Sequence, residues 1–449
     1  SLFEQHSHWR DVLAFTWHLT PCLGANEIAK GLVARQSAVK AQGFGLSDER
    51  TPPRLVKRVG RDCIEAIFSF ATAVGRGEGV LRLVAATDGG GIAGHKAWMI
   101  STSLEELKGF EPKIGARRPS GAAYSRNFGG DNWEGARRKA QLYEDHDPTV
   151  LVIGGAQAGL SIAAHLTQVG VDTLVVEKWP RIGDSWRKRY HSLALHNSIH
   201  VNNLPFLPFP QTWPEYVPKD MLGLWFEFYA QVMEINHWTN TEFCKGTWDA
   251  TEKRWIATLK MADGTERIIR PRHIVFANGV SSYPFIPEIP GLDEFNGEVL
   301  HSEGFDSGEP YAGKKALIIG TGSSANDIAL DFHSFGCDTT IIQRGSTTVV
   351  SIYPSAKLNY AIYDEDLSVE ECDMIGAAPT PALIIDAYKL SVKRMTELDK
   401  DMIEGLKGIG FKYDVGEDET GHQMKYRRRG GGYNLDAGSS ELMIKGEIG

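Results

Sequence analysis

The stretch Thr149–Glu177, TVLVIGGAQAGLSIAAHLTQVGVDTLVVE, decides the fold. Its first apolar run, Val150–Ile153, is too short for a helix and rich in β-branched residues, which is typical of a buried parallel strand. A glycine turn, an apolar helical pattern and a second strand-like run, Thr173–Val176, follow in order. The sequence therefore predicts a strand–helix–strand motif that ends in Glu177.

The turn of this first nucleotide motif has the composition of a dinucleotide-binding loop. Glycines let backbone approach a pyrophosphate at a helix N-terminus, and an acid after the second strand can bind a ribose hydroxyl. The loop departs from G-x-G-x-x-G at Ala156, which places a Cβ where backbone normally meets pyrophosphate. The residues predicted to bind this nucleotide are Gly154, Gly155, Ala156, Gln157, Ala158, Gly159 and Glu177.

A second nucleotide motif begins at Lys315, with strands over 316–319 and 339–342 and a helix over 326–335. Glu177 lies 23 positions after Gly154, whereas the residue 23 positions after Gly320 is Gln343, followed by Arg344. A neutral residue plus arginine suits a 2′-phosphate, because guanidinium forms charge-assisted pairs with phosphate. The second motif therefore predicts NADP(H), with a solvated Arg344 and a degenerate site as the alternative. Its predicted ligands are Gly320, Gly322, Ser323, Ser324 and Arg344.

Bulk composition is that of a globular chain with a large core. The 449 residues carry a formal charge of −9, which argues against nucleic acid as the main partner. No apolar run approaches the roughly 18 residues that span a bilayer, and no secretory signal is visible, so we expect a cytoplasmic protein. The five cysteines form no C-x-x-C pair, so neither a metal site nor a disulfide reductase is predicted. The chain begins at Ser1 rather than Met, which indicates processing or a fragment.

The other parts of the chain predict additional regions. Residues 1–110 predict a small α+β domain, with helical spacing over 8–15 and 26–41, strands over 64–72, 79–87 and 92–103, and a hairpin turn at 88–91. Residues 111–148 predict a polar linker. Residues 149–300 predict the first part of a dinucleotide-binding domain, and 301–360 the NADP(H)-binding Rossmann unit. Residues 361–449 predict a helical and irregular C-terminal region, with helices over 379–406, a basic loop over 425–432 and a strand over 442–444.

Residues 149–350 resemble the class B flavin-dependent monooxygenases, which include the flavin-containing, YUCCA-type and Baeyer–Villiger enzymes. The paired nucleotide motifs carry this resemblance, together with Phe295–Asp306 (FNGEVLHSEGFD), which fits F-x-G-x-x-x-H-x-x-x-[FYW]-[PD]. Phe276-Ala277-Asn278-Gly279 is similar to the A-T-G linker of that family. Residues 1–110 resemble the SnoaL-like cone fold, whose members enclose a ligand or form dimers. The implied fold is α/β, with two Rossmann-like dinucleotide-binding domains, for FAD and NADPH, after a small cone-like α+β domain.

The resemblance implies an FAD- and NADPH-dependent monooxygenase that uses a peroxide at flavin C4a. O₂ and a small organic substrate, either a nitrogen or sulfur nucleophile or a carbonyl compound, would be its partners, and a homodimer is one expected assembly. Asn197 is the implied catalytic residue beside flavin and nicotinamide, with a loop-capping asparagine as its alternative. His301 is implied to link the domains, or else to be a buried hydrogen-bonded histidine. The family pattern adds cofactor contacts at Lys178, Gly183, Trp186, Arg187, Ala277, Asn278 and Gly279.

One departure from the family pattern concerns the end of the chain. Members of the family usually finish with a strand and an A-T-G-like turn that close over the flavin, and no such segment is evident before Gly449. We therefore expect either a truncated C-terminal region or an unfamiliar element in place of this segment. The alternative function is a degenerate, non-catalytic flavoprotein with an N-terminal ligand-binding or dimerisation domain.

Overall fold

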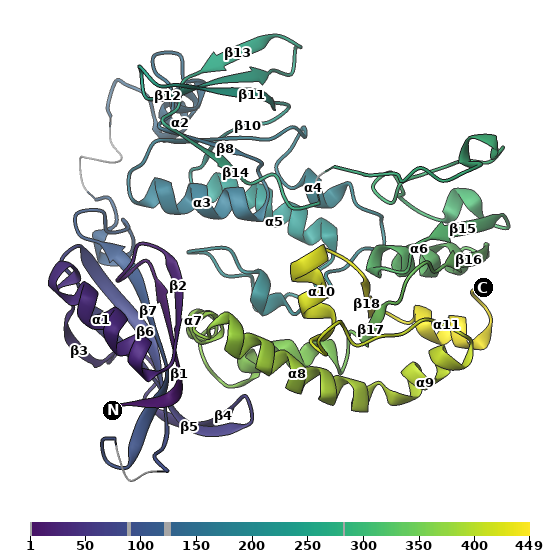
Figure 1. The fold of residues 1–449 in the computed structure, drawn as a ribbon. Helices are drawn as coiled ribbons and strands as arrows, with labels where there is room; N and C mark the ends of the chain where they lie inside the picture. Colours follow the sequence, from purple (N-terminus) through teal and green to yellow (C-terminus); the bar gives the residue numbers. More distant parts are fainter. Residues whose placement is uncertain (1, 88–90, 121–126, 282) are drawn as a thin grey trace. The chain divides into compact units, whose positions relative to one another are not determined.

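The computed structural model describes residues 2–87, 91–120, 127–281 and 283–449, which adopt an α/β fold (Figure 1). The chain divides into two compact units. The first comprises Ser1–Glu111, Thr321–Ser323 and Gln343–Lys445, and the second comprises Pro112–Gly320, Ser324–Ile342 and Gly446–Gly449. Each unit therefore combines segments that are far apart in the sequence.

The second compact unit contains a four-stranded parallel sheet in the order β10–β9–β8–β14. The strands are β8 (Val150–Ile153), β9 (Thr173–Val176), β10 (Asn236–Trp238) and β14 (His273–Phe276). The predicted first motif is confirmed, because α3 (Gln157–Gln168) connects the paired strands β8 and β9. All four residues of β9 are buried, as a continuous apolar run predicts for a parallel strand.

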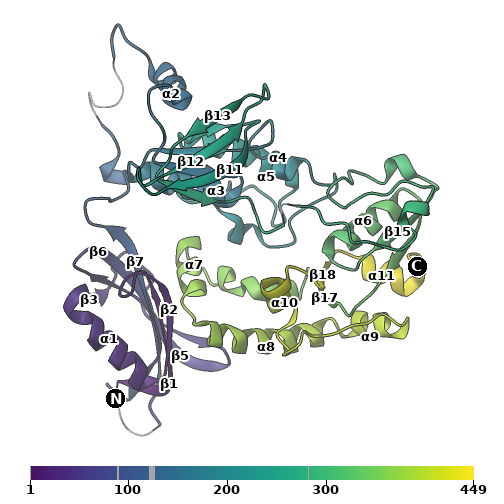
Figure 2. The same cartoon turned by 45° about the horizontal axis from the view of Figure 1, so that its top comes forward.

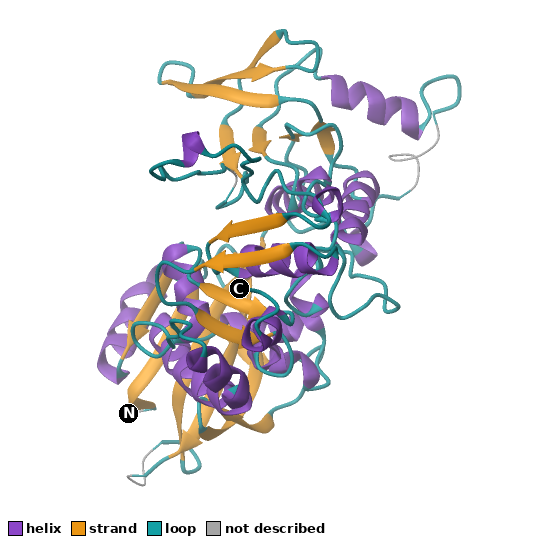
Figure 3. Ribbon diagram, turned by 90° about the vertical axis from the view of Figure 1, so that its right-hand side faces the viewer, coloured by secondary structure: helices purple, strands orange, loops and turns teal. Residues whose placement is uncertain are grey.

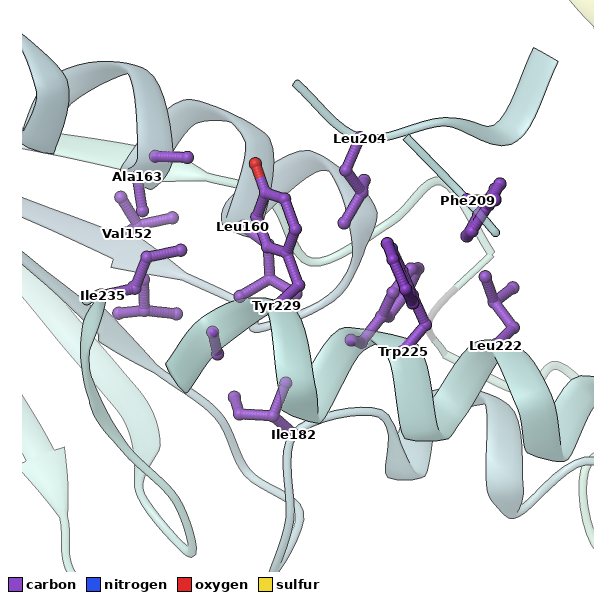
Figure 4. Close-up of a cluster of buried hydrophobic side chains, with 14 of the residues drawn as sticks. Val152, Leu160, Ala163, Ile182, Leu204, Phe209, Leu222, Trp225, Tyr229 and Ile235 are labelled. Carbon is purple, nitrogen blue, oxygen red and sulfur yellow. The ribbon is translucent and has the colours of Figure 1, made fainter. Parts of the chain in front are cut away.

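Helices cover one face of this sheet. Leu160 and Ala163 of α3 pack with Val152 of the sheet and with Trp225 and Tyr229 of α5 (Lys219–Val232), as Figure 4 shows. Burial of each large apolar side chain stabilises the fold by about 1.5–3 kcal/mol, so this cluster anchors both helices. The short helices α4 (Asp184–Arg187) and η3 (Ile199–Asn202) lie in the loop between β9 and α5.

An antiparallel sheet covers the opposite face. It consists of β11 (Glu242–Asp249), β12 (Arg254–Lys260) and β13 (Glu266–Ile269), and its Ala257 and Leu259 pack against Leu151 and Leu174. Alternate residues of β8 therefore face the two layers, and both are apolar because both are buried. Figure 3 shows these strands in orange and the helices in purple.

The predicted polar linker contains an ordered helix. Helix α2 (Trp133–Leu142) begins after Asn132, whose side chain accepts a hydrogen bond from the Gly135 amide at 2.9 Å. Tyr143, which follows the helix, is buried and donates to Asp172 at 2.8 Å. The helix end is thereby fixed to the domain that follows it.

The second nucleotide motif has the predicted order. Strands β15 (Lys315–Ile319) and β16 (Asp338–Ile342) pair in parallel, and α6 (Ser323–Ser334) connects them. Two single turns precede the motif, η4 (Leu292–Glu294) and η5 (Glu309–Tyr311).

The first compact unit contains a seven-stranded sheet in the order β2–β1–β7–β6–β5–β3, with β4 also paired to β5. Its elements are β1 (Phe3–Val12), β2 (Leu19–Leu23), α1 (Ala25–Val39), β3 (Gln42–Leu46), β4 (Arg54–Arg58), β5 (Arg61–Ala71), β6 (Gly75–Ala85) and β7 (His95–Leu107). The single turn η1 (Gly115–Arg117) follows in the second unit. The predicted turn at 88–91 lies outside the described residues except for Gly91.

The prediction of a helix over 8–15 is wrong, because most of this segment belongs to strand β1. Ser7, Trp9 and Asp11 are buried at alternate positions, which is the two-residue period of a strand. His8 and Arg10 contact the C-terminal region instead: His8 Nδ1 lies 2.8 Å from Thr380 Oγ1, and Arg10 donates to the Pro379 carbonyl at 3.0 Å. Both faces of the strand are therefore covered, so its hydrophobic pattern is weak.

Helix α1 packs on one face of the seven-stranded sheet, and C-terminal helices pack on the other (Figures 1 and 2). The second contact combines Ile67, Val80 and Met99 of the sheet with Ile375 of α7 (Val369–Ala377) and Leu383 of α8 (Pro381–Leu398). A buried ion-pair network adjoins it. Glu65, with a side chain only 1% exposed, lies 2.8 Å from Arg54 and Arg58 and 2.9 Å from Arg82.

The C-terminal region also differs from its predictions. Residues 425–432 were expected as a loop and 442–444 as a strand, but helices α10 (Gly421–Arg429) and α11 (Ser439–Lys445) occupy these positions. Gly430 ends α10 in the left-handed conformation, and Asp436 caps α11 through the Ser440 amide at 3.0 Å. The helical pair predicted over 379–406 is confirmed as α8 and α9. The remaining elements are β17 (Thr348–Ser351), η6 (Ala356–Asp364), α9 (Lys400–Gly408) and β18 (Tyr433–Asp436), which pairs in parallel with β17.

Candidate dinucleotide and flavin site

The first glycine turn is built so closely that side chains would not fit in it. Gly154 has a φ of 105°, and a Cβ at this position would stand 2.6 Å from the Ala277 carbonyl oxygen. A Cβ on Gly159 would stand 1.9 Å from the Gly154 carbonyl oxygen, and one on Gly155 would stand 2.6 Å from Ile182. The glycines therefore draw the strand, the turn and the helix together, as a dinucleotide loop requires.

The turn presents the N-terminus of α3. Ala156 is the N-cap residue, and no side chain in the described part of the chain caps this end of the helix. The first amides of a helix lack internal partners and carry partial positive charge, so they attract a phosphate. Ala156 adopts an extended conformation with φ −99°, which needs no glycine. The backbone thus fits the pyrophosphate of a dinucleotide despite the missing central glycine.

Glu177 lies at the end of β9 next to this turn. It is buried, and its two carboxylate oxygens accept hydrogen bonds from the backbone amides of Gly155 (2.8 Å) and Trp179 (3.0 Å). Each carboxylate oxygen can accept more than one hydrogen bond, so capacity for ribose hydroxyls remains. Lys178, the next residue, contacts Trp179: its ammonium lies 5.0 Å from the centre of the Trp179 ring.

A cavity of about 270 Å³ opens at the N-terminal end of α3. Gln157, Ala158 and Ser161 of α3 line it together with Trp186, and the Trp186 ring nitrogen donates to the Gln157 side chain at 3.3 Å. The remaining wall consists of Val201, Asn202, Asn203, Leu204, Leu222 and Phe226. A mixed wall of apolar groups and amides suits a flat aromatic ligand whose edge carries polar atoms.

Gly183 and Arg187 fasten the loop beside this cavity to α5. Gly183 has a φ of 90°, and a Cβ there would stand 2.1 Å from the Gly223 carbonyl oxygen. The Arg187 guanidinium donates to the Gly223 carbonyl at 2.8 Å and to Glu227 at 2.7 Å. It also pairs with Asp184 at 2.9 Å, so its charge is compensated within the protein. These contacts fasten the loop that carries Trp186 to α5.

The segment Ala277–Gly279 follows β14 and passes the first glycine turn. The Ala277 amide donates to the Ile153 carbonyl at 2.8 Å, and its carbonyl oxygen faces Gly154. Gly279 has a φ of 83°. The structure therefore brings this linker together with the first nucleotide motif, although the two are more than a hundred residues apart.

Asn197 lies behind the cavity wall and contacts one of the residues that form it. Its side-chain oxygen accepts a hydrogen bond at 3.2 Å from Asn202, which lines the cavity. Ser198, the next residue, is buried and accepts from the same Asn202 amide at 2.9 Å. Asn197 therefore supports the wall through Asn202, a residue that the sequence had not singled out.

The second glycine turn contains Gly320, with a φ of 123°, and continues into α6. The Ser323 hydroxyl accepts from the Leu435 amide at 3.0 Å, and a Cβ on Gly322 would stand 3.7 Å from the Tyr433 carbonyl oxygen. Strand β18 thus lies beside Gly322 and Ser323, the part of the turn that belongs to the same compact unit as β18. No sequence signal placed β18 at this motif, because the two are separated by about a hundred residues.

Arg344 follows the end of β16, and a second cation accompanies it. The Gln343 side chain bonds the backbone of Lys412 at both ends, to its amide at 2.7 Å and its carbonyl at 3.0 Å. The Lys412 ammonium consequently lies 3.3 Å from the Arg344 carbonyl oxygen. The residue that replaces the acid of the first motif therefore recruits an additional positive charge.

His301 is placed away from the cavity lining. Its Nδ1 accepts from the Glu303 amide at 3.1 Å within its own turn. The end of the same sequence pattern is better connected: Phe305 is buried with Tyr190 and Leu193 and with Ile328 of α6. The structure therefore does not bring His301 together with Asn197, and the pattern contributes Phe305 as its packing residue.

About half of this chain is similar to known proteins. Residues 151–365 match the model of a family described as pyridine nucleotide-disulphide oxidoreductase. Indole-3-pyruvate monooxygenase YUCCA1 of Oryza sativa subsp. japonica is 32% identical over 204 residues, which are 45% of this chain and 49% of that protein. Probable indole-3-pyruvate monooxygenase YUCCA8 of Arabidopsis thaliana is 34% identical over 204 residues, or 44% and 48% of the two chains. The chain spans about half the length of these relatives.

A flavin-containing monooxygenase from Stenotrophomonas maltophilia is similar among solved structures. It is 21% identical, the match covers 52% of this chain and 69% of that chain, and the TM-score is 0.42. The residues matched by the family model contain both glycine turns. Flavin monooxygenases of this class use FAD and NADPH. None of the helices in the described ranges is both long and apolar enough to cross a membrane.

Proposed function

We propose that this chain is an FAD- and NADPH-dependent monooxygenase that oxygenates a small organic substrate. The observation that supports this most is the cavity of about 270 Å³ at the uncapped N-terminus of α3, because helix amides that attract a phosphate stand there beside apolar walls that suit a flat ring. The second motif, with Arg344 and Lys412 after β16, supplies a separate site suited to a 2′-phosphate. Two different dinucleotides on one chain are what a hydride transfer between cofactors requires.

FAD would lie with its pyrophosphate on the α3 amides, its adenosine ribose at Glu177 and its ring toward Trp186. When bound, FAD supplies the redox chemistry, taking a hydride from NADPH and reducing O₂. The protein contributes position and exclusion of water. Leu204, Leu222 and Phe226 keep the cavity apolar, while Asn202, held by Asn197, directs an amide at its wall. The catalytic roles of Asn197 and His301 stay predictions: Asn197 contacts the cavity wall through Asn202, and His301 bonds within its own turn.

The substrate class follows from the class of enzyme and from the names of the relatives. We infer a small organic molecule, either a nitrogen or sulfur nucleophile or a carbonyl compound. The relatives are named for indole-3-pyruvate, so an aromatic 2-oxo acid is a rational first test of the carbonyl class. A tertiary amine, a thioether and a cyclic ketone cover the other classes.

The test uses the purified chain reconstituted with FAD. We expect one FAD per chain, loss of the flavin absorbance on addition of NADPH without O₂, and its return on exposure to air. NADPH consumption should rise with one of the four substrates, with an oxygenated product in place of hydrogen peroxide. Protein that retains no flavin, or flavin that NADPH does not reduce, would refute the proposal. Bound and reducible flavin that makes only peroxide with every substrate would favour the non-catalytic alternative.

A further inference from the structure

Asp327 of α6 stands between the second nucleotide motif and the loop that carries Asn197. Its side chain is 10% exposed, and one carboxylate oxygen, Oδ2, meets two side chains of that loop. The Tyr190 hydroxyl donates to it at 2.5 Å, and His196 Nε2 lies 2.9 Å from it. The Ser324 hydroxyl also bonds to the Tyr190 phenol. Ser324 is one of the residues predicted to hold NADPH.

The surroundings keep these contacts fixed. Tyr190 is only 2% exposed and packs with Leu193, Phe305 and Ile328. Burial first, and the neighbouring charge of Asp327 second, raise the pKa of the Tyr190 phenol, which therefore remains a donor. A carboxylate removed from water needs such donors, because its desolvation is otherwise unfavourable by several kcal/mol. Contacts with both Tyr190 and His196 therefore stabilise the buried carboxylate of Asp327.

The loop transmits this arrangement to the cavity. His196 precedes Asn197, whose side-chain oxygen accepts from Asn202 at 3.2 Å, and Asn202 lines the cavity. A continuous path therefore runs from Ser324 through Tyr190, Asp327 and His196 to the cavity wall. Every residue of this path belongs to the second compact unit.

We propose that Asp327 is a positioning residue that couples occupancy of the second nucleotide turn to the placement of Asn197 and the cavity wall. The inference rests on the proposed function, because it takes the second turn as the NADPH site. NADPH or NADP⁺ bound at Ser324 would reorient that hydroxyl, and Tyr190 and Asp327 would pass the change to His196. The cofactor at one site would thereby set the geometry at the other.

The test compares Asp327→Asn with Asp331→Asn in the full chain. Asp331 is a suitable control because it lies one turn further along the same helix, has a side chain only 5% exposed, and accepts a hydrogen bond from the Gly308 amide at 2.6 Å. Amide hydrogen exchange over residues 193–204 is measured with and without saturating NADP⁺, both with FAD and without it. Tyr190→Phe, which keeps the ring and removes the hydroxyl, provides a second variant should Asp327→Asn unfold.

We expect NADP⁺ to slow exchange of this segment about 5-fold or more in the natural chain and in Asp331→Asn, the lower range of typical coupling between sites. The effect should disappear in Asp327→Asn and in Tyr190→Phe, while both variants still bind FAD. Equal slowing in all four proteins would overturn the inference, and so would its absence from the natural chain with NADP⁺ bound. FAD retention and reduction are scored separately, so failure of the proposed function is recognised independently of this coupling.

Discussion

The carbonyl oxygen of Gly154 faces Gly159 so closely that a Cβ on Gly159 would stand 1.9 Å from it. The close approach draws the end of β8 against the first turn of α3 and leaves the helix amides open to a ligand. Gly159→Ala should force the turn apart, because backbone cannot yield as a flexible side chain does. We expect FAD affinity to fall about 100-fold or more, roughly 3 kcal/mol, measured by titration of the apoprotein with FAD. Gly376→Ala, at a helical position with open space around it, should bind FAD as the natural chain does. Equal affinity in the two variants would contradict this account of the turn.

Arg344→Ala tests the second motif. A charge-assisted hydrogen bond contributes about 1.5–3 kcal/mol, so the dissociation constant for NADPH should rise about 10- to 100-fold. The constant for NADH should stay unchanged, because NADH lacks the 2′-phosphate. Lys315→Ala, which removes a cation that is 90% exposed at the start of β15, is the control. A parallel loss of NADPH and NADH binding in Arg344→Ala would mean that the residue supports the fold and does not read the phosphate.

Glu65 in the seven-stranded sheet is the shared acceptor of three arginines. Burial opposes its ionisation, but hydrogen bonds and charges from Arg58 and Arg82 lower its pKa to about 2. Glu65→Gln would leave the buried Arg82 guanidinium without its carboxylate partner, whereas Arg54 and Arg58 would keep Glu365. We therefore expect the free energy of unfolding to fall by about 3–5 kcal/mol. Urea unfolding followed by circular dichroism measures it. Asp62→Asn, at an exposed position 3.9 Å from Lys57, should change the midpoint little. If the midpoint of Glu65→Gln lay as close to that of the natural chain as the midpoint of Asp62→Asn does, the network would have no structural role.

The burial of His422 in α10 predicts that the folded protein loses stability in acid. Burial lowers its pKa from 6.5 to about 4, and its Nε2 lies 3.1 Å from the Asn359 amide. Below pH 6.5 the unfolded chain takes up a proton on this ring that the folded chain excludes, so stability should fall as pH falls toward 4. The shift corresponds to about 3 kcal/mol. Unfolding midpoints at pH 7.5, 6 and 4.5 should decline less steeply for His422→Gln than for the natural chain. His18→Gln, at an exposed position, should follow the natural chain. Identical slopes for all three proteins would refute the role of His422.

Local patterns were sufficient for the two nucleotide motifs. A short apolar strand, a glycine turn and an apolar helix each have a period or composition of their own, and β8, α3 and β9 follow them. Patterns failed where tertiary contacts determine the structure. Strand β1 was mistaken for a helix because His8 and Arg10 are polar residues that bond the C-terminal region. Lys412 and Asp327 escaped notice because their partners come from distant parts of the chain.

The helices at 369–398 that cover the seven-stranded sheet follow it by more than 250 residues in the chain. During synthesis the sheet therefore emerges from the ribosome with one apolar face uncovered. Ile375 and Leu383, which cover this face, are synthesised much later. Exposed β-sheet surface of this kind promotes association with other chains during folding. Synthesis of this protein thus contains an interval in which a chaperone, or fast completion of the chain, determines the yield of folded product.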